Sequence, residues 1–243
     1  MTTSEPTRRA QYPWALTLVS APVLALLIGL GVWQVQRLQW KEGLMDRADV
    51  AAAKAPVPIT YLPPGPDREF RQVTIDCPGL ATAPFVELQS ILDGEAGVRL
   101  ISACSEPPAP GRPETGVLLI DRGFVAEAVS ARPPVTRERQ PLRLVAVVRT
   151  ATTPGLMALP PEGRHFYARD NAAMARVLGV TSLVGPETLY AVTSTNPDWP
   201  ALRPSVPPVA FANNHLGYAL TWFGLALALI GFYIALVRRK LKS

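Results

Sequence analysis

The stretch Leu216–Val237 reads LGYALTWFGLALALIGFYIALV and contains no charged residue. A second charge-free stretch, WALTLVSAPVLALLIGLGVW, occupies Trp14–Trp33 near the other end of the chain. At ~1.5 Å of rise per residue, about 20 residues cover the ~30 Å hydrocarbon core of a bilayer. The N-terminal stretch is too long for the apolar part of a signal peptide, and no small-residue cleavage site follows it directly. The two stretches therefore predict transmembrane helices at 14–33 and 214–237.

Charges outside these stretches indicate the orientation of the chain. The formal net charge of +5 comes entirely from the tails, residues 1–13 and 238–243, because the segment between them is neutral overall. Basic tails favour the cytoplasm, and this outweighs Arg37 and Lys41 because long loops translocate largely regardless of their charge. The N-terminal tail lacks the acid-poor, Arg- and Ser-rich character of a transit peptide. We expect a multi-pass protein of a bacterial inner membrane, with both termini cytoplasmic and residues 34–213 periplasmic.

The segment between the helices is rich in proline and in short alternating runs, which predicts a mostly β, α+β domain with one core. Expected strands are Phe70–Cys77, Phe85–Leu92, Val98–Cys104, Val117–Val125, Leu142–Arg149 and Thr188–Thr195. A short helix is expected after Asp170 as its N-cap, with Gly179 closing it. Ala51–Asp67 and Asn196–Val209 are expected to be extended linkers. The predicted fold is two transmembrane α-helices, N- and C-terminal, enclosing this extracytoplasmic domain.

Residues suited to enzyme chemistry are scarce, with only two cysteines and two histidines in the chain. Cys77 and Cys104 both lie at the ends of expected strands, and an oxidising compartment permits a disulfide worth about 3 kcal/mol. Two free buried thiols are the alternative. His165 is expected to be an exposed or capping residue. Because no nucleophile–base arrangement or phosphate-binding loop is found, we expect no enzymatic activity. A neutral folded surface likewise argues against a nucleic-acid partner, whereas membrane lipid is expected.

The C-terminal stretch carries a stripe of small residues at alternating spacings of four and three. Its members are Gly217, Thr221, Gly224, Ala228, Gly231 and Ala235. Small residues let a second helix approach closely, and the N-terminal stretch offers a matching row, Ala21, Ala25 and Gly29. We expect these two rows to face each other. His215, Tyr218 and Trp222 then lie about 130° away on the helical wheel, free for lipid, a cofactor or a partner protein.

His215 lies at the outer mouth of the membrane, where partial desolvation favours the neutral imidazole that ligates metals. If the first helix persists past the bilayer, Arg37 stands near the level of His215. A guanidinium beside a ligating imidazole suits a heme, which has anionic propionates and an iron that takes an axial histidine. The alternative is that four aromatic residues are interfacial and His215 is a polar interface residue; the four are Trp33, Trp40, Tyr218 and Trp222.

Three motifs resemble those of the Surfeit locus protein 1 family. Gly31–Lys41 (GVWQVQRLQWK) resembles the family's G-x-W-Q-x-x-R-x-x-W-K signature, and Asn213–Phe223 (NNHLGYALTWF) resembles its N-x-H-x-x-Y-A-x-T-W segment. Between them, Asp121–Val125 (DRGFV) resembles an N-R-G-W/F-V strand, with aspartate where asparagine is usual. A Trp expected before Arg169-Asp170 is absent. The resemblance nevertheless extends over essentially the whole chain.

The resemblance implies an assembly factor for heme-copper cytochrome c oxidase that binds heme a and assists its insertion into subunit I. It implies that His215 is the axial ligand of the heme iron. We expect Tyr218 and Trp222 to contact the macrocycle, Arg37 to meet a propionate, and Trp33 to support the heme or the helix pair. Candidate partners are subunit I, heme A synthase and a second copy of the chain. The alternative is a cofactor-free scaffold that stabilises oxidase subunits through its β-rich domain.

Overall fold

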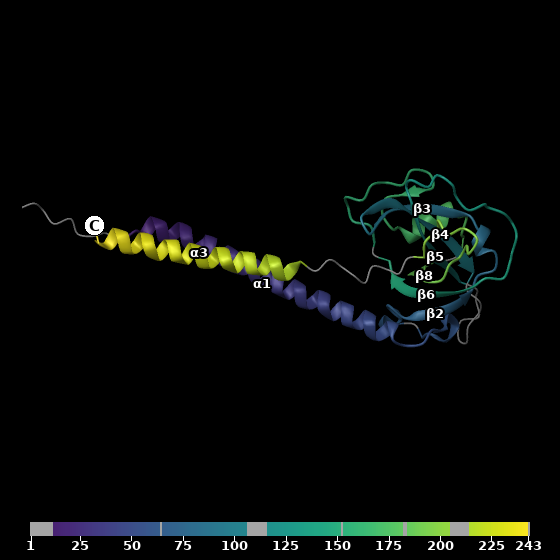
Figure 1. Ribbon diagram of the computed structural model, residues 1–243, viewed down its shortest axis with the longest axis horizontal. Helices are drawn as coiled ribbons and strands as arrows, with labels where there is room; N and C mark the ends of the chain where they lie inside the picture. Colours follow the sequence, from purple (N-terminus) through teal and green to yellow (C-terminus); the bar gives the residue numbers. More distant parts are fainter. Residues whose placement is uncertain are drawn as a thin grey trace, which may run out of the picture. The chain divides into compact units, whose positions relative to one another are not determined.

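The computed structural model describes residues 12–63, 65–105, 116–151, 153–181, 184–204 and 214–242. They belong to two compact units, one comprising Met1–Met45 with Ala210–Ser243 and the other Asp46–Val209. The first unit contains most of α1 (Trp14–Ala52) and all of α3 (His215–Lys242), and the second contains a β-sheet (Figure 1). Asn213 and most of the N-terminal tail lie outside the described residues.

The two long helices form where the charge-free stretches predict them. Both are long and apolar enough, by length and composition, to cross a membrane. The first helix does not end with its apolar stretch, because α1 continues past Trp33 to Ala52. The added residues, QVQRLQWKEGLMDRADVAA, are mostly strong helix formers without proline, so nothing in them stops the helix.

The first unit is an antiparallel helix pair. Gln34 of α1 contacts His215 at the start of α3, whereas Thr17 near the start of α1 contacts Tyr233 near the end of α3. Near the chain termini, the Tyr233 hydroxyl lies 2.7 Å from Thr17 Oγ1 and 2.6 Å from the Tyr12 hydroxyl. The pair is therefore held by polar contacts at both ends, and Figure 1 shows its helices side by side.

The prediction that the small-residue rows face each other is wrong. On α3, a Cβ atom added to Gly217, Gly224 or Gly231 would meet no heavy atom within 4 Å, so this stripe has no partner in the described chain. The Ala21, Ala25 and Gly29 row of α1 is likewise exposed.

The face of α3 that meets α1 instead carries the buried Ala219 and Ala226. It also carries the half-buried His215 and Trp222. The closest approach is at Gly31 of α1, where an added Cβ would lie 2.6 Å from Cε1 of Phe223. One aromatic ring in a glycine notch, together with hydrogen bonds at both ends, thus decides which faces meet.

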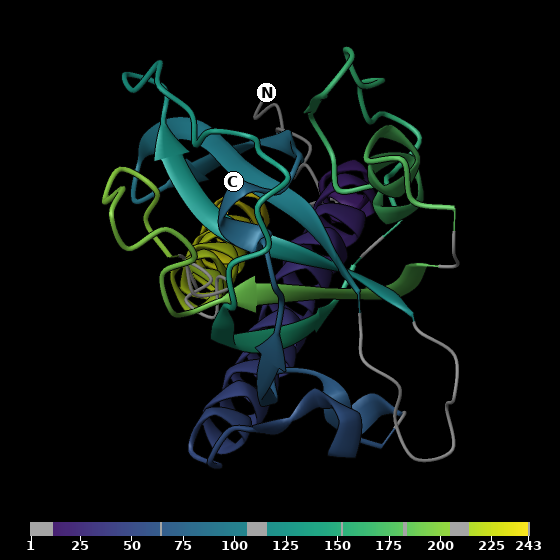
Figure 2. The same ribbon diagram turned by 90° about the vertical axis from the view of Figure 1, so that its right-hand side faces the viewer.

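The second unit is built on one eight-stranded mixed sheet. Its strands are β1 (Val57–Pro58), β2 (Gln72–Asp76), β3 (Phe85–Leu92), β4 (Glu95–Ser105), β5 (Val117–Ala126), β6 (Arg143–Thr150), β7 (His165–Phe166) and β8 (Val184–Ala191). They lie in the order β1-β2-β6-β8-β5-β4-β3-β7, which can be followed from β3 to β2 in Figure 1. Figure 2 shows that the sheet is strongly twisted.

Most of the predicted strands and the predicted short helix are confirmed. Five strands agree closely, and the last one begins earlier than expected, at Val184 instead of Thr188. The helix is α2 (Asn171–Val177), whose N-cap Asp170 accepts a hydrogen bond from the Ala173 N–H. Gly179 follows it at φ 74°, the left-handed geometry expected of a closing glycine.

The segments predicted to be linkers are instead part of the fold. Within 51–67, Ile59 is buried in the core and β1 pairs with β2. In the described part of 196–209, Leu202 is buried and Arg203 pairs with Phe124 of β5. Residues 205–209 lie outside the described residues. Proline prevents regular helix but not packing, so isolated apolar residues between prolines still reach the core.

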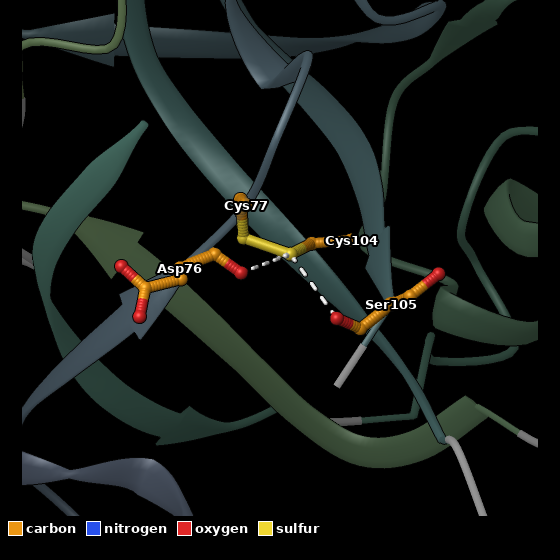
Figure 3. The surroundings of a disulfide bond; sticks show 4 residues. All are labelled: Asp76, Cys77, Cys104 and Ser105. Carbon is orange, nitrogen blue, oxygen red and sulfur yellow. Dashed lines mark hydrogen bonds between the residues drawn. A yellow bond between two sulfur atoms is a disulfide. The ribbon is translucent and has the colours of Figure 1, made fainter. Parts of the chain in front are cut away.

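The cysteines form a disulfide, so the free-thiol alternative is excluded (Figure 3). Cys77 directly follows β2 and Cys104 lies in β4, with Cα atoms 5.7 Å apart. The Cys104 sulfur also lies 3.9 Å from the Asp76 carbonyl oxygen and 3.7 Å from that of Ser105. Because three strands separate β2 from β4 in the sheet order, the bond requires the sheet to curl back on itself.

Charged groups are buried around the Asp-Arg-Gly motif in the middle of β5. Asp121 accepts hydrogen bonds from Arg169 Nη2 at 2.7 Å and from Arg99 Nη1 at 3.2 Å. Arg122 is fully buried and donates to the Ala81 carbonyl oxygen and to Asn196 Oδ1, at 2.7 and 2.6 Å. Burial lowers the pKa of Arg122 to about 10. These contacts tie β5 to neighbouring strands and loops, which is a structural role.

Candidate cofactor site on the helix pair

The candidate site lies where α3 begins and is formed around His215. The imidazole is half-buried against α1, and its Nδ1 atom lies 2.6 Å from Oε1 of Gln34. The Trp33 ring meets the imidazole edge to face, with ring centroids 6.4 Å apart and planes at 84°. Two motifs from opposite ends of the chain therefore meet at this point.

Two cations of α1 act electrostatically on this histidine. Arg37 is one turn beyond Trp33 and places its guanidinium 4.0 Å above the Trp40 ring. Lys41 is one turn further along, and the positive charges of both Lys41 and Arg37 act on the His215 ring. The end of the helix pair at His215 is thus electropositive and suits an anionic ligand.

His215, Tyr218 and Trp222, which the helical wheel places on one face of α3, have different surroundings in the structure. His215 and Trp222 lie on the side of α3 that meets α1, so the expectation that they look away from α1 is wrong. Tyr218 is on the flank of that face and is 56% exposed. On α1, Trp33 is 53% exposed and lies beside His215. Of the predicted residues, Trp33 and His215 are in direct contact, whereas Arg37 stacks on Trp40 instead.

Sequence reasoning assigned no role to Gln34 or Lys41, although both lie in the N-terminal signature. A usable signal was present. Gln34 follows Gly31 by three residues, so both lie on one face of a helix, and a polar amide beside a glycine notch faces the neighbouring helix.

The available donor groups fit a heme. Because Nδ1 of His215 is occupied by Gln34 and no hydrogen bond to Nε2 is found among the described residues, Nε2 is the atom available to iron. The guanidinium of Arg37 and the ammonium of Lys41 suit carboxylate propionates. The exposed faces of Trp33 and Tyr218 offer aromatic surface to a planar macrocycle. One imidazole supplies only one of the two axial positions.

The second histidine has a different environment. His165 lies in β7, where its Nε2 atom is 3.1 Å from Oε1 of Gln89 and its ring is 5.0 Å from that of Tyr167. Glu87 Oε2 lies 3.7 Å from its Nδ1 atom. One ring nitrogen is hydrogen-bonded and the other lies near a carboxylate, so this histidine serves as an internal control for the first.

Comparisons with known proteins agree with the motifs. The profile described as the SURF1 family matches residues 21–227. Surfeit locus protein 1 from Homo sapiens is 29% identical over 235 residues, covering 88% of this chain and 74% of that protein. The protein of the same name from Takifugu rubripes is 26% identical over 245 residues, covering 94% and 98% of the two chains. A SURF1-like protein from Monosiga brevicollis is 27% identical over 245 residues, covering 93% and 87%. The profile match covers the whole sheet domain and parts of both long helices, and the chain belongs to the SURF1 family.

Proposed function

We propose that this chain is a non-enzymatic, membrane-bound assembly factor for cytochrome c oxidase that binds heme a and assists its insertion into subunit I. The observation that carries the proposal is the meeting of the two membrane-proximal motifs at His215, beside Gln34 and Trp33. A heme bound there would supply iron for one imidazole ligand and two carboxylates for the neighbouring cations.

Each residue of the site has a distinct part in this proposal. His215 presents Nε2 as the axial donor, while Gln34 holds its other nitrogen. Arg37 and Lys41 would bind propionates as charge-assisted partners, and the exposed rings of Tyr218 and Trp33 would contact the macrocycle. A heme held by one imidazole of this chain would be incompletely ligated, which would favour transfer over permanent storage.

The proposed location is a bacterial inner membrane, with both termini cytoplasmic and the sheet domain periplasmic. The cations Arg239, Lys240 and Lys242 in the last turn of α3 support a cytoplasmic C-terminus. The Cys77–Cys104 disulfide supports an oxidising compartment for the domain. Alkaline phosphatase and green fluorescent protein fused after residue 243 test the orientation: only the fluorescent fusion should be active, and an active phosphatase fusion would contradict it.

The direct test is the absorption spectrum of protein purified from cells that make heme a. His215→Ala should lose bound heme, whereas His165→Ala, the matched control in the sheet domain, should retain the wild-type spectrum. Formation of the Cys77–Cys104 disulfide in each variant verifies that the domain has folded. Unchanged heme content in His215→Ala would exclude this residue as the ligand.

A cofactor-free scaffold is the second candidate, and one surface feature favours it. The loop after β6 exposes three large apolar side chains close together, Leu156, Met157 and Leu159. Such a cluster is typical of a protein contact, and methionine adapts well to partner surfaces. Co-purification with subunit I from a strain unable to make heme a, abolished by Leu156→Glu with Met157→Glu, would favour the scaffold.

A further inference from the structure

The short contact between His215 and Gln34 determines which nitrogen of the imidazole carries the proton. His215 Nδ1 lies 2.6 Å from Gln34 Oε1, and this oxygen is a carbonyl oxygen that can only accept a hydrogen bond. The proton of a neutral imidazole must then reside on Nδ1. A neutral histidine in water instead prefers the proton on Nε2, so this contact reverses the ordinary preference.

We propose that Gln34 is a positioning residue that fixes His215 as the Nδ1–H tautomer and so keeps the lone pair of Nε2 available to a metal. The inference rests on the proposed function for its purpose, but the tautomer is a property of the chain alone. A ligating histidine requires its lone pair on the ligating nitrogen, and an acceptor on the other nitrogen both fixes the tautomer and orients the ring.

The packing of the helices explains why a glutamine can perform this task. Gly31 lies one turn before Gln34 on the same face of α1, and its missing side chain admits the Phe223 ring. This close passage brings the start of α3 within reach of the Gln34 amide. Glutamate in the same position would keep both the reach and the acceptor, whereas leucine would keep the volume and remove the acceptor.

The tautomer can be measured in the full-length, heme-free protein by long-range ¹H–¹⁵N correlation spectra with ¹⁵N-labelled histidine in lipid nanodiscs. The chain contains only two histidines, so His165 provides an internal reference. We expect His215 to show a protonated Nδ1 and an unprotonated Nε2. Gln34→Leu should shift this signal toward the Nε2–H form, and Gln34→Glu should preserve the wild-type pattern.

Gln36→Leu is the matched control, because Gln36 is exposed on the same helix and should leave the tautomer unchanged. The inference is overturned if wild-type His215 carries its proton on Nε2, since the Gln34 amide would then present its NH₂ group. It is also overturned if Gln34→Leu leaves the Nδ1–H tautomer in place.

A titration with heme a separates this inference from the proposed function. Gln34→Leu should weaken the binding of heme a by about 10- to 100-fold, whereas the Gln34→Glu variant should bind heme a as tightly as the wild type. If the wild type binds no heme a but retains the Nδ1–H tautomer in a Gln34-dependent manner, the proposed function fails and the positioning by Gln34 stands. Equal affinity of wild type and Gln34→Leu would contradict the positioning role.

Discussion

The helix pair and the sheet domain differ in which side chains they bury: the helices leave most of their apolar residues exposed, whereas the domain buries even charged groups. In the most apolar stretch of each long helix, only 6% of the residues are buried. The buried residues of α3 are the small Ala219 and Ala226. The domain instead buries the carboxylate of Asp121 between two arginines. A helix satisfies its backbone internally and can leave apolar side chains to lipid, whereas a domain in water must bury them and pair whatever charge goes with them. The two units should therefore be sensitive to different substitutions.

The largest expected effect comes from removing the buried charge of the domain. Asp121→Asn leaves Arg99 and Arg169 facing a neutral amide in the interior, which should lower the free energy of unfolding by about 3–5 kcal/mol. Urea unfolding of the full chain in detergent, followed by near-UV circular dichroism, measures the change. Asp76→Asn is the matched control, because its ion pair with Arg143 is exposed and should contribute too little to resolve. Equal stability of the two variants would show that the buried ion pair does not hold the domain together.

The next effect tests the backbone of the same strand. Gly123 has φ 133°, and an added Cβ would collide with the carbonyl oxygen of Arg203. Gly123→Ala should therefore destabilise the domain by about 2–4 kcal/mol in the same assay. Gly155→Ala should change stability by less than about 0.5 kcal/mol, since a Cβ there meets nothing within 4 Å. A tolerated Gly123→Ala would contradict the pairing of Arg203 with Phe124.

A third substitution acts on the helix pair and should leave the domain unchanged. Gly31→Val forces the Phe223 ring out of its notch and should widen the helix separation by about 1–2 Å, the spread among packed helices. Spin labels on Val32→Cys and Leu220→Cys measure this distance. Gly29→Val on α1 and Gly224→Val on α3 are controls, because an added Cβ meets nothing within 4 Å at either position. If Gly224→Val increased the distance between α1 and α3 and Gly31→Val did not, the small-residue stripe would be the contact face after all.

The smallest expected effect is the pH dependence of the exposed ion pair. The Arg143 guanidinium lowers the pKa of Asp76 below its ordinary value of 3.8. The stabilisation is therefore fully present above pH 3.8 and is lost as the pH falls through the lower pKa of the folded state. In Arg143→Gln, an NMR titration of the Asp76 carboxyl should give a pKa closer to 3.8. An unchanged pKa would mean that Arg143 does not cause the shift.

The elements that the sequence predicts correctly have local signals. Period-two alternation locates β2, and a capping aspartate with a closing glycine locates α2. The segments around Ile59 and Leu202 lack such signals, because prolines interrupt the few apolar residues there and their burial depends on strands elsewhere in the chain.

The candidate site shows the same division between local and long-range information. The sequence identifies His215 and Trp33, since each lies in a motif at the end of an apolar stretch. It does not reveal which faces meet, because each helix has a plausible row of small residues. That choice depends on Phe223 fitting against Gly31 and on a hydrogen bond between residues 181 positions apart.

The pairing of α1 with α3 also determines when, during synthesis of the chain, the contact between them can form. Gln34 is synthesised early, but His215 emerges from the ribosome only after the whole sheet domain has been made. The histidine–glutamine contact therefore cannot form on a nascent chain that has stalled or been truncated before α3.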